Sequence, residues 1–136
     1  MRPVFTRVFQ GLAWLVLAGL LVQFYLAGAA LFGATTFQPH RTLGSVLAVA
    51  VLLLLVLAVV ARPSRRLVGR TALLAGLTIV QVVLPSLRPN LPWVAALHGV
   101  VAVGIAAQAA AIARAPGRAT VASRSPDTPA AVGSST

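Results

Sequence analysis

The two histidines are the side chains of this sequence with the most evident chemical use. His40 lies in the segment FQPHRTLG, and His98 lies in PWVAALHGVVAVGIAAQAA, which is otherwise apolar. An ionisable group inside an apolar segment is costly, so it usually has a partner or a task. The only acidic residue, Asp127, lies near the C-terminus and far along the chain from both histidines. Neutral imidazoles without carboxylates suit haem iron, which takes axial histidines from facing helices.

Two arginines would complete such a haem site. Arg41 follows His40, and Arg88 precedes the apolar segment that contains His98. Guanidinium groups donate charge-assisted hydrogen bonds to carboxylates such as the haem propionates. The sequence therefore offers His40 and His98 as axial ligands of a b-type haem, with Arg41 and Arg88 as propionate contacts. No other metal centre is expected.

The depth of the two histidines in a membrane argues against this hypothesis. His40 is expected at or above the membrane interface, because it precedes its apolar segment. His98 follows Trp93, an interfacial residue, by five positions, or about 8 Å along a helix. Ligands of one iron must lie at similar depth, so the helix that carries His40 would have to sit lower than its apolar segment suggests.

The remaining composition excludes several kinds of chemistry. The chain has no cysteine, so it cannot form disulfides, thiolate metal sites or a cysteine nucleophile. Without acidic residues in the apolar part, it lacks carboxylate pairs, catalytic triads and carboxylate metal sites. Transport coupled to protons or cations also commonly uses an intramembrane carboxylate. The sequence therefore favours a protein that is not an enzyme, although it leaves enzymatic activity open.

Hydropathy predicts the elements that position these residues. Hydrophobic residues make up 59% of the chain and its mean hydropathy is +0.95, which is typical of a membrane protein. The expected fold is all-α, an integral membrane bundle of four antiparallel helices in up-down-up-down order. It occupies residues 1–114, with spans at about 8–33, 42–61, 71–87 and 93–112. Residues 115–136 are polar, without an apolar period, and are expected to form a disordered cytoplasmic tail. No internal repeat is evident beyond the two hairpins.

The arginines predict the orientation of this bundle. Arg41 and Arg88 fall on one side of the membrane, and nine arginines fall on the other. The nine are Arg2, Arg7, Arg62, Arg65, Arg66, Arg70, Arg114, Arg118 and Arg124. Cytoplasmic loops carry the excess of arginine, so both termini are expected in the cytoplasm. The arginines are scattered between apolar spans, so their expected partners are anionic lipid headgroups and not nucleic acid.

Polar residues within the predicted spans lie on stripes of small residues. Gln23 shares such a stripe with Gly19 and Ala27, and Thr78 and Gln81 share one face of the third span. These residues are expected to face one interior with His98, where side chains hydrogen-bond between helices. Such packing contacts alone are the alternative explanation for both glutamines and both histidines.

Several segments resemble a family of small bacterial four-span membrane proteins known as a domain of unknown function. The resemblance covers residues 5–113 and lies in VQFYLAGAALFG, FQPHRTLG, IVQVVLPSL and WVAALHGV. It implies a four-span fold in the bacterial cytoplasmic membrane, without an established activity. The family pattern falls on Gln23, Gly28, Gly33, His40, Gly44, Gln81, Leu97 and His98. Where the family often continues with Pro and Asn after Leu-His, this chain has Gly99 and Val100.

Two functions from different classes remain at this point. The first is a non-enzymatic membrane subunit or scaffold, whose partner is a second copy or another membrane protein. The second is electron transfer or haem handling with His40 and His98, because a four-span unit with histidines on spans two and four is similar in architecture to half of a haem A synthase. A small-molecule transporter is disfavoured, because the sequence has no intramembrane carboxylate and no pair of broken helices.

Overall fold

The chain forms four long helices. The computed structural model describes residues 3–61 and 64–115. The elements are α1 Pro3–Leu31, α2 Gln38–Ala61, α3 Arg65–Val83, the 3₁₀ turn η1 Leu84–Leu87, and α4 Pro92–Ala113. All regular structure in these two ranges is helical, which confirms the predicted all-α class. Each of α1, α2, α3 with η1, and α4 is long and apolar enough to cross a membrane, as expected of a multi-pass membrane protein.

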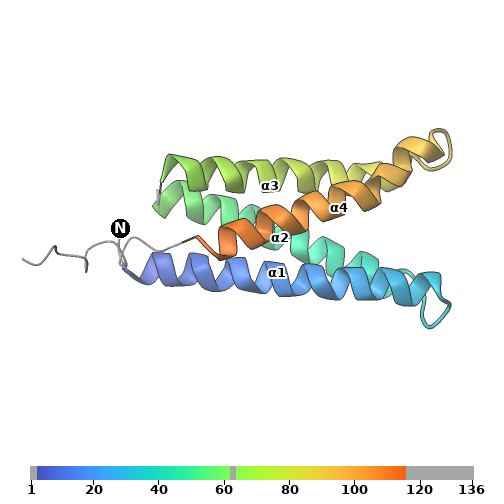
Figure 1. Ribbon diagram of the computed structural model, residues 1–136, viewed down its shortest axis with the longest axis horizontal. Coiled ribbons are helices and arrows are strands. Elements are labelled where there is room, and N and C mark those ends of the chain that lie inside the picture. Colours follow the sequence, from blue (N-terminus) through green and yellow to red (C-terminus); the bar gives the residue numbers. More distant parts are fainter. Residues whose placement is uncertain (1–2, 62–63, 116–136) are drawn as a thin grey trace, which may run out of the picture.

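The helices pack as a four-membered ring of antiparallel neighbours. α1 packs against α2, α2 against α3, α3 against α4, and α4 closes the ring against α1 (Figure 1). The α1–α2 and α3–α4 hairpins therefore form the two halves of the bundle. The predicted four-helix bundle is confirmed.

The helices are longer than the apolar segments that predict them. α2 begins at Gln38, with Pro39 in its first turn, where a proline costs no hydrogen bond. α3 begins at Arg65 because the Ser64 hydroxyl accepts a hydrogen bond from the Leu67 amide at 3.2 Å. Pro85 falls in the short 3₁₀ turn that follows α3. The predicted tail lies outside the described residues from position 116 onward.

The hydrophobic core lies toward one end of the bundle. We call this the terminal end, because α1 begins there and α4 ends there (Figure 1). Its fully buried side chains include Val16, Leu54, Leu74 and Ile112, one from each helix. At the same end, the Gln10 side-chain amide donates a hydrogen bond to the Ala113 carbonyl, which ties α1 to α4.

The two hairpins separate toward the opposite end, which we call the histidine end. There the α1–α2 turn and the loop between η1 and α4 diverge (Figure 1). His40 and His98 come from the helix starts at this end, in α2 and α4. The bundle is thus tightly packed at the terminal end and open at the histidine end.

The turn after α1 sets the position of His40 along the length of the bundle. Gly33 adopts a left-handed φ of 74°, and the Ala34 amide donates back to the Ala29 carbonyl at 2.8 Å. This Schellman arrangement stops the helix and reverses the chain, and glycine takes the conformation without strain. The first turn of α2 consequently lies beside the middle part of α1 and not beside its last turn. The Gln23 carbonyl that His40 contacts lies eight residues before Leu31, or about 12 Å along the helix.

Candidate functional site

His40 is held by the backbone of the neighbouring helix. Its Nδ1 lies 3.2 Å from the carbonyl oxygen of Gln23 in α1. A carbonyl oxygen can only accept, so Nδ1 carries the hydrogen and donates it. In the neutral ring the other nitrogen, Nε2, then has a free lone pair. The hydrogen bond therefore fixes both the tautomer and the direction of the ring.

His98 is held in the same way in the second hairpin. Its Nδ1 lies 3.1 Å from the carbonyl oxygen of Gln81 in α3 and donates to it. Nε2 of His98 is consequently also a lone-pair donor to a metal or an acceptor for a hydrogen bond. Each hairpin thus supplies one oriented imidazole.

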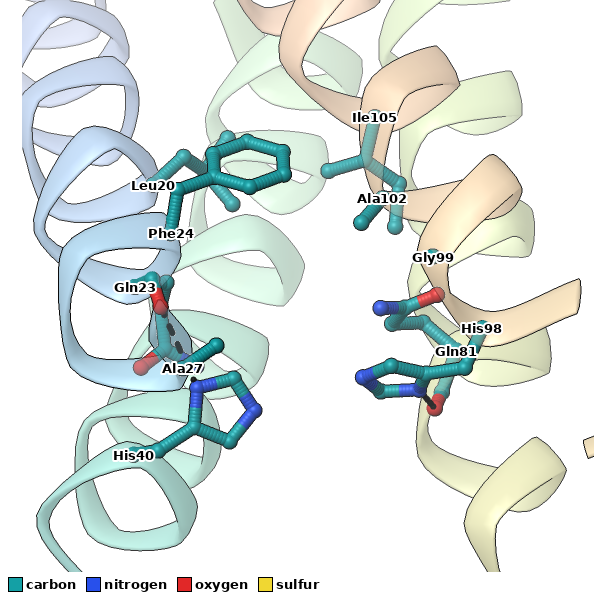
Figure 2. Close-up of a pocket in the computed structure, with 10 residues that line it drawn as sticks. All are labelled: Leu20, Gln23, Phe24, Ala27, His40, Gln81, His98, Gly99, Ala102 and Ile105. Carbon is teal, nitrogen blue, oxygen red and sulfur yellow. Dashed lines mark hydrogen bonds between the residues drawn. The ribbon is translucent and has the colours of Figure 1, made fainter. Parts of the chain in front are cut away.

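The two imidazoles face each other across the boundary between the hairpins. Their ring centroids are 6.2 Å apart and their planes are inclined by 64°. Figure 2 shows that the ring nitrogen not bonded to a carbonyl points, in each histidine, toward the space between them. The site therefore presents two lone pairs to one small volume.

This spacing suits one metal ion between the rings. A metal–imidazole bond is about 2 Å long, and a ring nitrogen is about 1 Å from its centroid, so two imidazoles on opposite sides of one metal would have centroids about 6 Å apart. The observed 6.2 Å agrees with that geometry. The two imidazoles lie close together although the sequence predicts different membrane depths for them.

A cavity of about 140 Å³ adjoins the histidines (Figure 2). α1 and α4 provide most of its wall, and α2 and α3 contribute only His40 and Gln81. The wall consists of Leu20, Gln23, Phe24, Ala27, His40, Gln81, His98, Gly99, Ala102 and Ile105. One of the lining residues, Phe24, is 42% exposed.

The glutamines contribute their side chains as well as their carbonyls to this region. Among the described residues, the Oε1 atoms of Gln23 and Gln81 are buried without a hydrogen-bond partner. Gly44 makes room for one of these amides, because a Cβ atom at Gly44 would lie 2.8 Å from Nε2 of Gln23. Buried polar atoms without partners are uncommon and require an explanation. Here they lie beside a cavity that could admit water or a ligand.

Three other residues predicted for the site lie away from the cavity wall. Arg41 and Arg88 are exposed near the histidine end. The Thr78 hydroxyl donates to the Leu74 carbonyl at 2.8 Å, within its own helix. The structure thus groups Gln23, His40, Gln81 and His98 and leaves both arginines at the periphery.

The sequence carries a signal of this arrangement that sequence analysis missed. Gln23 precedes His40 by 17 residues, and Gln81 precedes His98 by the same 17. Both pairs join the two helices of a hairpin through the same backbone contact. The two hairpins therefore repeat one Gln–His unit, although no repeat beyond the hairpin plan was expected.

A comparison with protein families gives a match over part of the chain. Residues 23–87 match DUF6220, a family of unknown function. The predicted resemblance to a family of unknown function is confirmed. The DUF6220 segment begins at Gln23 and includes His40, Gly44 and Gln81, whereas His98 lies beyond it. No curated protein and no solved structure gives a significant match, so the likeness to half of a haem A synthase gains no support.

Proposed function

We propose that this membrane protein binds one b-type haem, with His40 and His98 as its two axial ligands. The observation that carries the proposal is the pair of facing Nε2 atoms, each made available by an Nδ1–H donated to a backbone carbonyl. Metal-binding histidines commonly donate their second ring N–H to an oxygen in this way, which fixes the ring direction.

The number of ligands favours haem over a free metal ion. Within the described residues, no group of three or more His, Cys, Asp and Glu side chains could hold a metal. A protein zinc site needs three or four protein ligands, whereas haem iron has four nitrogens from its own macrocycle and needs two. Two histidines from facing hairpins therefore suffice for haem and fall short for zinc.

The chain's residues would hold and shield the group. The Gln23 and Gln81 carbonyls would hold both imidazoles directed inward through the hydrogen bonds that they accept from Nδ1–H. Gly99 and Ala102 leave space beside His98. Arg41 and Arg88 are exposed at the same end of the bundle, where they would contact the propionates. When bound, the haem would supply one-electron transfer.

The size of the cavity sets a condition on this proposal. Its volume of about 140 Å³ is below the roughly 300–1,000 Å³ of pockets that hold drug-sized ligands. A macrocycle therefore requires the hairpins to part further at the histidine end. Most of the buried side chains lie toward the terminal end, so fewer apolar contacts oppose such a movement at the histidine end, where Leu47 and Leu84 are buried.

A scaffold without a cofactor is the second candidate. Each histidine bonds within its own hairpin, and such interhelical hydrogen bonds contribute about 0.6 kcal/mol in membrane proteins. This role explains the Nδ1 contacts. It gives no reason for the two Nε2 atoms to face each other, which is why we favour haem.

We also propose that the terminal end faces the cytoplasm of a bacterial cell and the histidine end faces outward. In the described residues, Arg7, Arg65, Arg66, Arg70 and Arg114 lie toward the terminal end and Arg41 and Arg88 toward the other. We expect a reporter fused after Thr136 to be active on the cytoplasmic side of the membrane and inactive on the outer side. Activity of that reporter on the outer side would reverse the orientation.

The visible spectrum of the purified protein tests the main proposal. Protein made in haem-supplemented cells, or mixed with haemin in detergent, should show the sharp Soret band of six-coordinate haem, shifting on reduction. One haem per chain is expected. A colourless protein that does not bind added haemin would return both histidines to the scaffold function.

A further inference from the structure

We infer that the cavity beside the histidines binds one small neutral ring molecule with two adjacent hydroxyl groups, the catechol class. This inference goes beyond the haem proposal, because it concerns the cavity as the structure has it, with the two hairpins together. A haem and a catechol would use the same two ring nitrogens, so the two ligands would bind alternately.

The volume of the cavity fits a single six-membered ring. The cavity measures about 140 Å³. An apolar cavity of roughly 150 Å³ in a protein interior stays dry and holds one benzene molecule. The cavity therefore has room for one ring with small substituents.

The wall of the cavity is divided into an apolar end and a polar end. Leu20, Phe24 and Ile105 lie at one end, and His40 and His98 lie at the other (Figure 2). A ligand that fills both ends needs an apolar body and one polar edge. No arginine, lysine, aspartate or glutamate is among the residues of the wall, so a charged ligand would lose its hydration without a compensating charge. The ligand class is therefore neutral and amphipathic.

The tautomers of the two histidines determine which polar groups the ligand carries. Nδ1 of each ring donates to a backbone carbonyl, so Nε2 of each neutral ring can only accept a hydrogen bond. A ketone, ether or quinone oxygen has no hydrogen to donate to these nitrogens, whereas a hydroxyl group has one. The polar edge of the ligand is therefore a hydrogen-bond donor.

The separation of the two acceptors favours two donors on neighbouring atoms. The ring centroids are 6.2 Å apart, and each Nε2 lies about 1 Å from its centroid toward the other ring, which leaves about 4 Å between the nitrogens. Hydroxyl groups on adjacent ring carbons point in nearly the same direction, so each can donate to one imidazole. In the 1,4 isomer the two groups point in opposite directions, and only one of them can reach the histidines.

The three isomers of dihydroxybenzene test this inference, because they share their atoms and nearly their volume. Each isomer is titrated under argon into the purified apoprotein in detergent, with protein-free micelles as the blank. Catechol should bind about tenfold more tightly than hydroquinone or resorcinol, because each of these isomers leaves one imidazole without its hydrogen bond. With nitrogen-15 in the histidines, catechol should shift the Nε2 resonances of both rings.

Variants on α4 separate the two ends of the cavity. His98→Leu removes one acceptor, so the affinities for catechol and hydroquinone should become equal. Ala102→Leu fills space in the cavity and should weaken the binding of all three isomers. Ala107, on the same helix, is exposed and lies outside the cavity wall, so Ala107→Leu should bind all three isomers like the wild type. Thermal unfolding of each variant verifies that the bundle is folded.

The outcomes separate this inference from the haem proposal. Equal affinities of the wild type for the three isomers, or no saturable binding of catechol, would overturn the catechol site and leave the haem spectrum as a separate test. A catechol preference that survives in His98→Leu would also overturn it, since the two imidazoles would not be the acceptors. A protein that prefers catechol but takes up no haemin would retain this inference and lose the haem proposal.

Discussion

Replacing His98 with alanine should abolish the six-coordinate haem spectrum and lower haem affinity by about 100-fold or more. Loss of a residue that only orients a metal ligand typically costs 10- to 100-fold in affinity, and loss of the ligand itself should cost at least as much. His40→Ala should have the same effect, because the structure gives both imidazoles equivalent contacts. Titration with haemin, followed at the Soret band, measures both affinities.

Added imidazole provides the control for these variants. Removing the ring of His98 leaves a space beside Gly99 and Ala102 that free imidazole can enter. Millimolar imidazole should therefore restore the six-coordinate spectrum in His98→Ala and leave the wild-type spectrum unchanged. The free energy of unfolding of each variant apoprotein should differ from that of the wild-type apoprotein by less than about 1 kcal/mol, because each variant loses one hydrogen bond. Unchanged haem spectra in both variants would remove the histidines from the site.

Replacing Leu74 with alanine should destabilise the bundle by about 2–5 kcal/mol. Leu74 is fully buried among side chains from the neighbouring helices, and truncation there leaves a cavity that the packed core cannot fill. Leu73, the adjacent residue, is 49% exposed on the membrane-facing surface. Leu73→Ala should cost less than about 1 kcal/mol, since lipid chains replace the lost methyl groups. Unfolding of both variants by denaturing detergent measures the difference.

The comparison of Leu73 and Leu74 also tests the helix rotation. Both residues are leucines at adjacent positions of α3, and they differ only in the face of the helix on which they lie. Equal costs for the two variants would contradict the arrangement of α3 in the bundle.

The fold was predictable because each membrane-spanning helix can be recognised from the hydropathy of its own segment. Four long apolar runs separated by arginines and prolines predict four helices, and short connections predict antiparallel neighbours. Helix ends were harder to predict, since they depend on local caps. Ser64 starts α3 well before its apolar run, and Pro39 joins α2 because its first turn needs no proline amide.

The site was predictable only in part. Polar residues in apolar spans usually face other helices, which is why sequence analysis singled out Gln23, His40, Gln81 and His98. It did not predict that the two rings lie within 6.2 Å of each other, since that depends on the three-dimensional arrangement of the hairpins. The partners of the histidines were also hidden, because they are backbone carbonyls, which every residue has. The equal spacing of 17 residues was visible in the sequence and would have suggested two equivalent hairpins.

Because the bundle is packed unevenly, the residues that stabilise the fold and the residues that line the cavity lie at different ends. Side chains that hold the helices together, such as Leu54 and Ile112, lie toward the terminal end, and the cavity residues His40 and His98 lie toward the other. Local opening can involve one part of a protein while its best-packed part stays closed. Substitutions around the cavity can therefore alter what the protein binds at little cost to its thermal stability. The histidine end can acquire new ligand preferences while the terminal end keeps the chain folded.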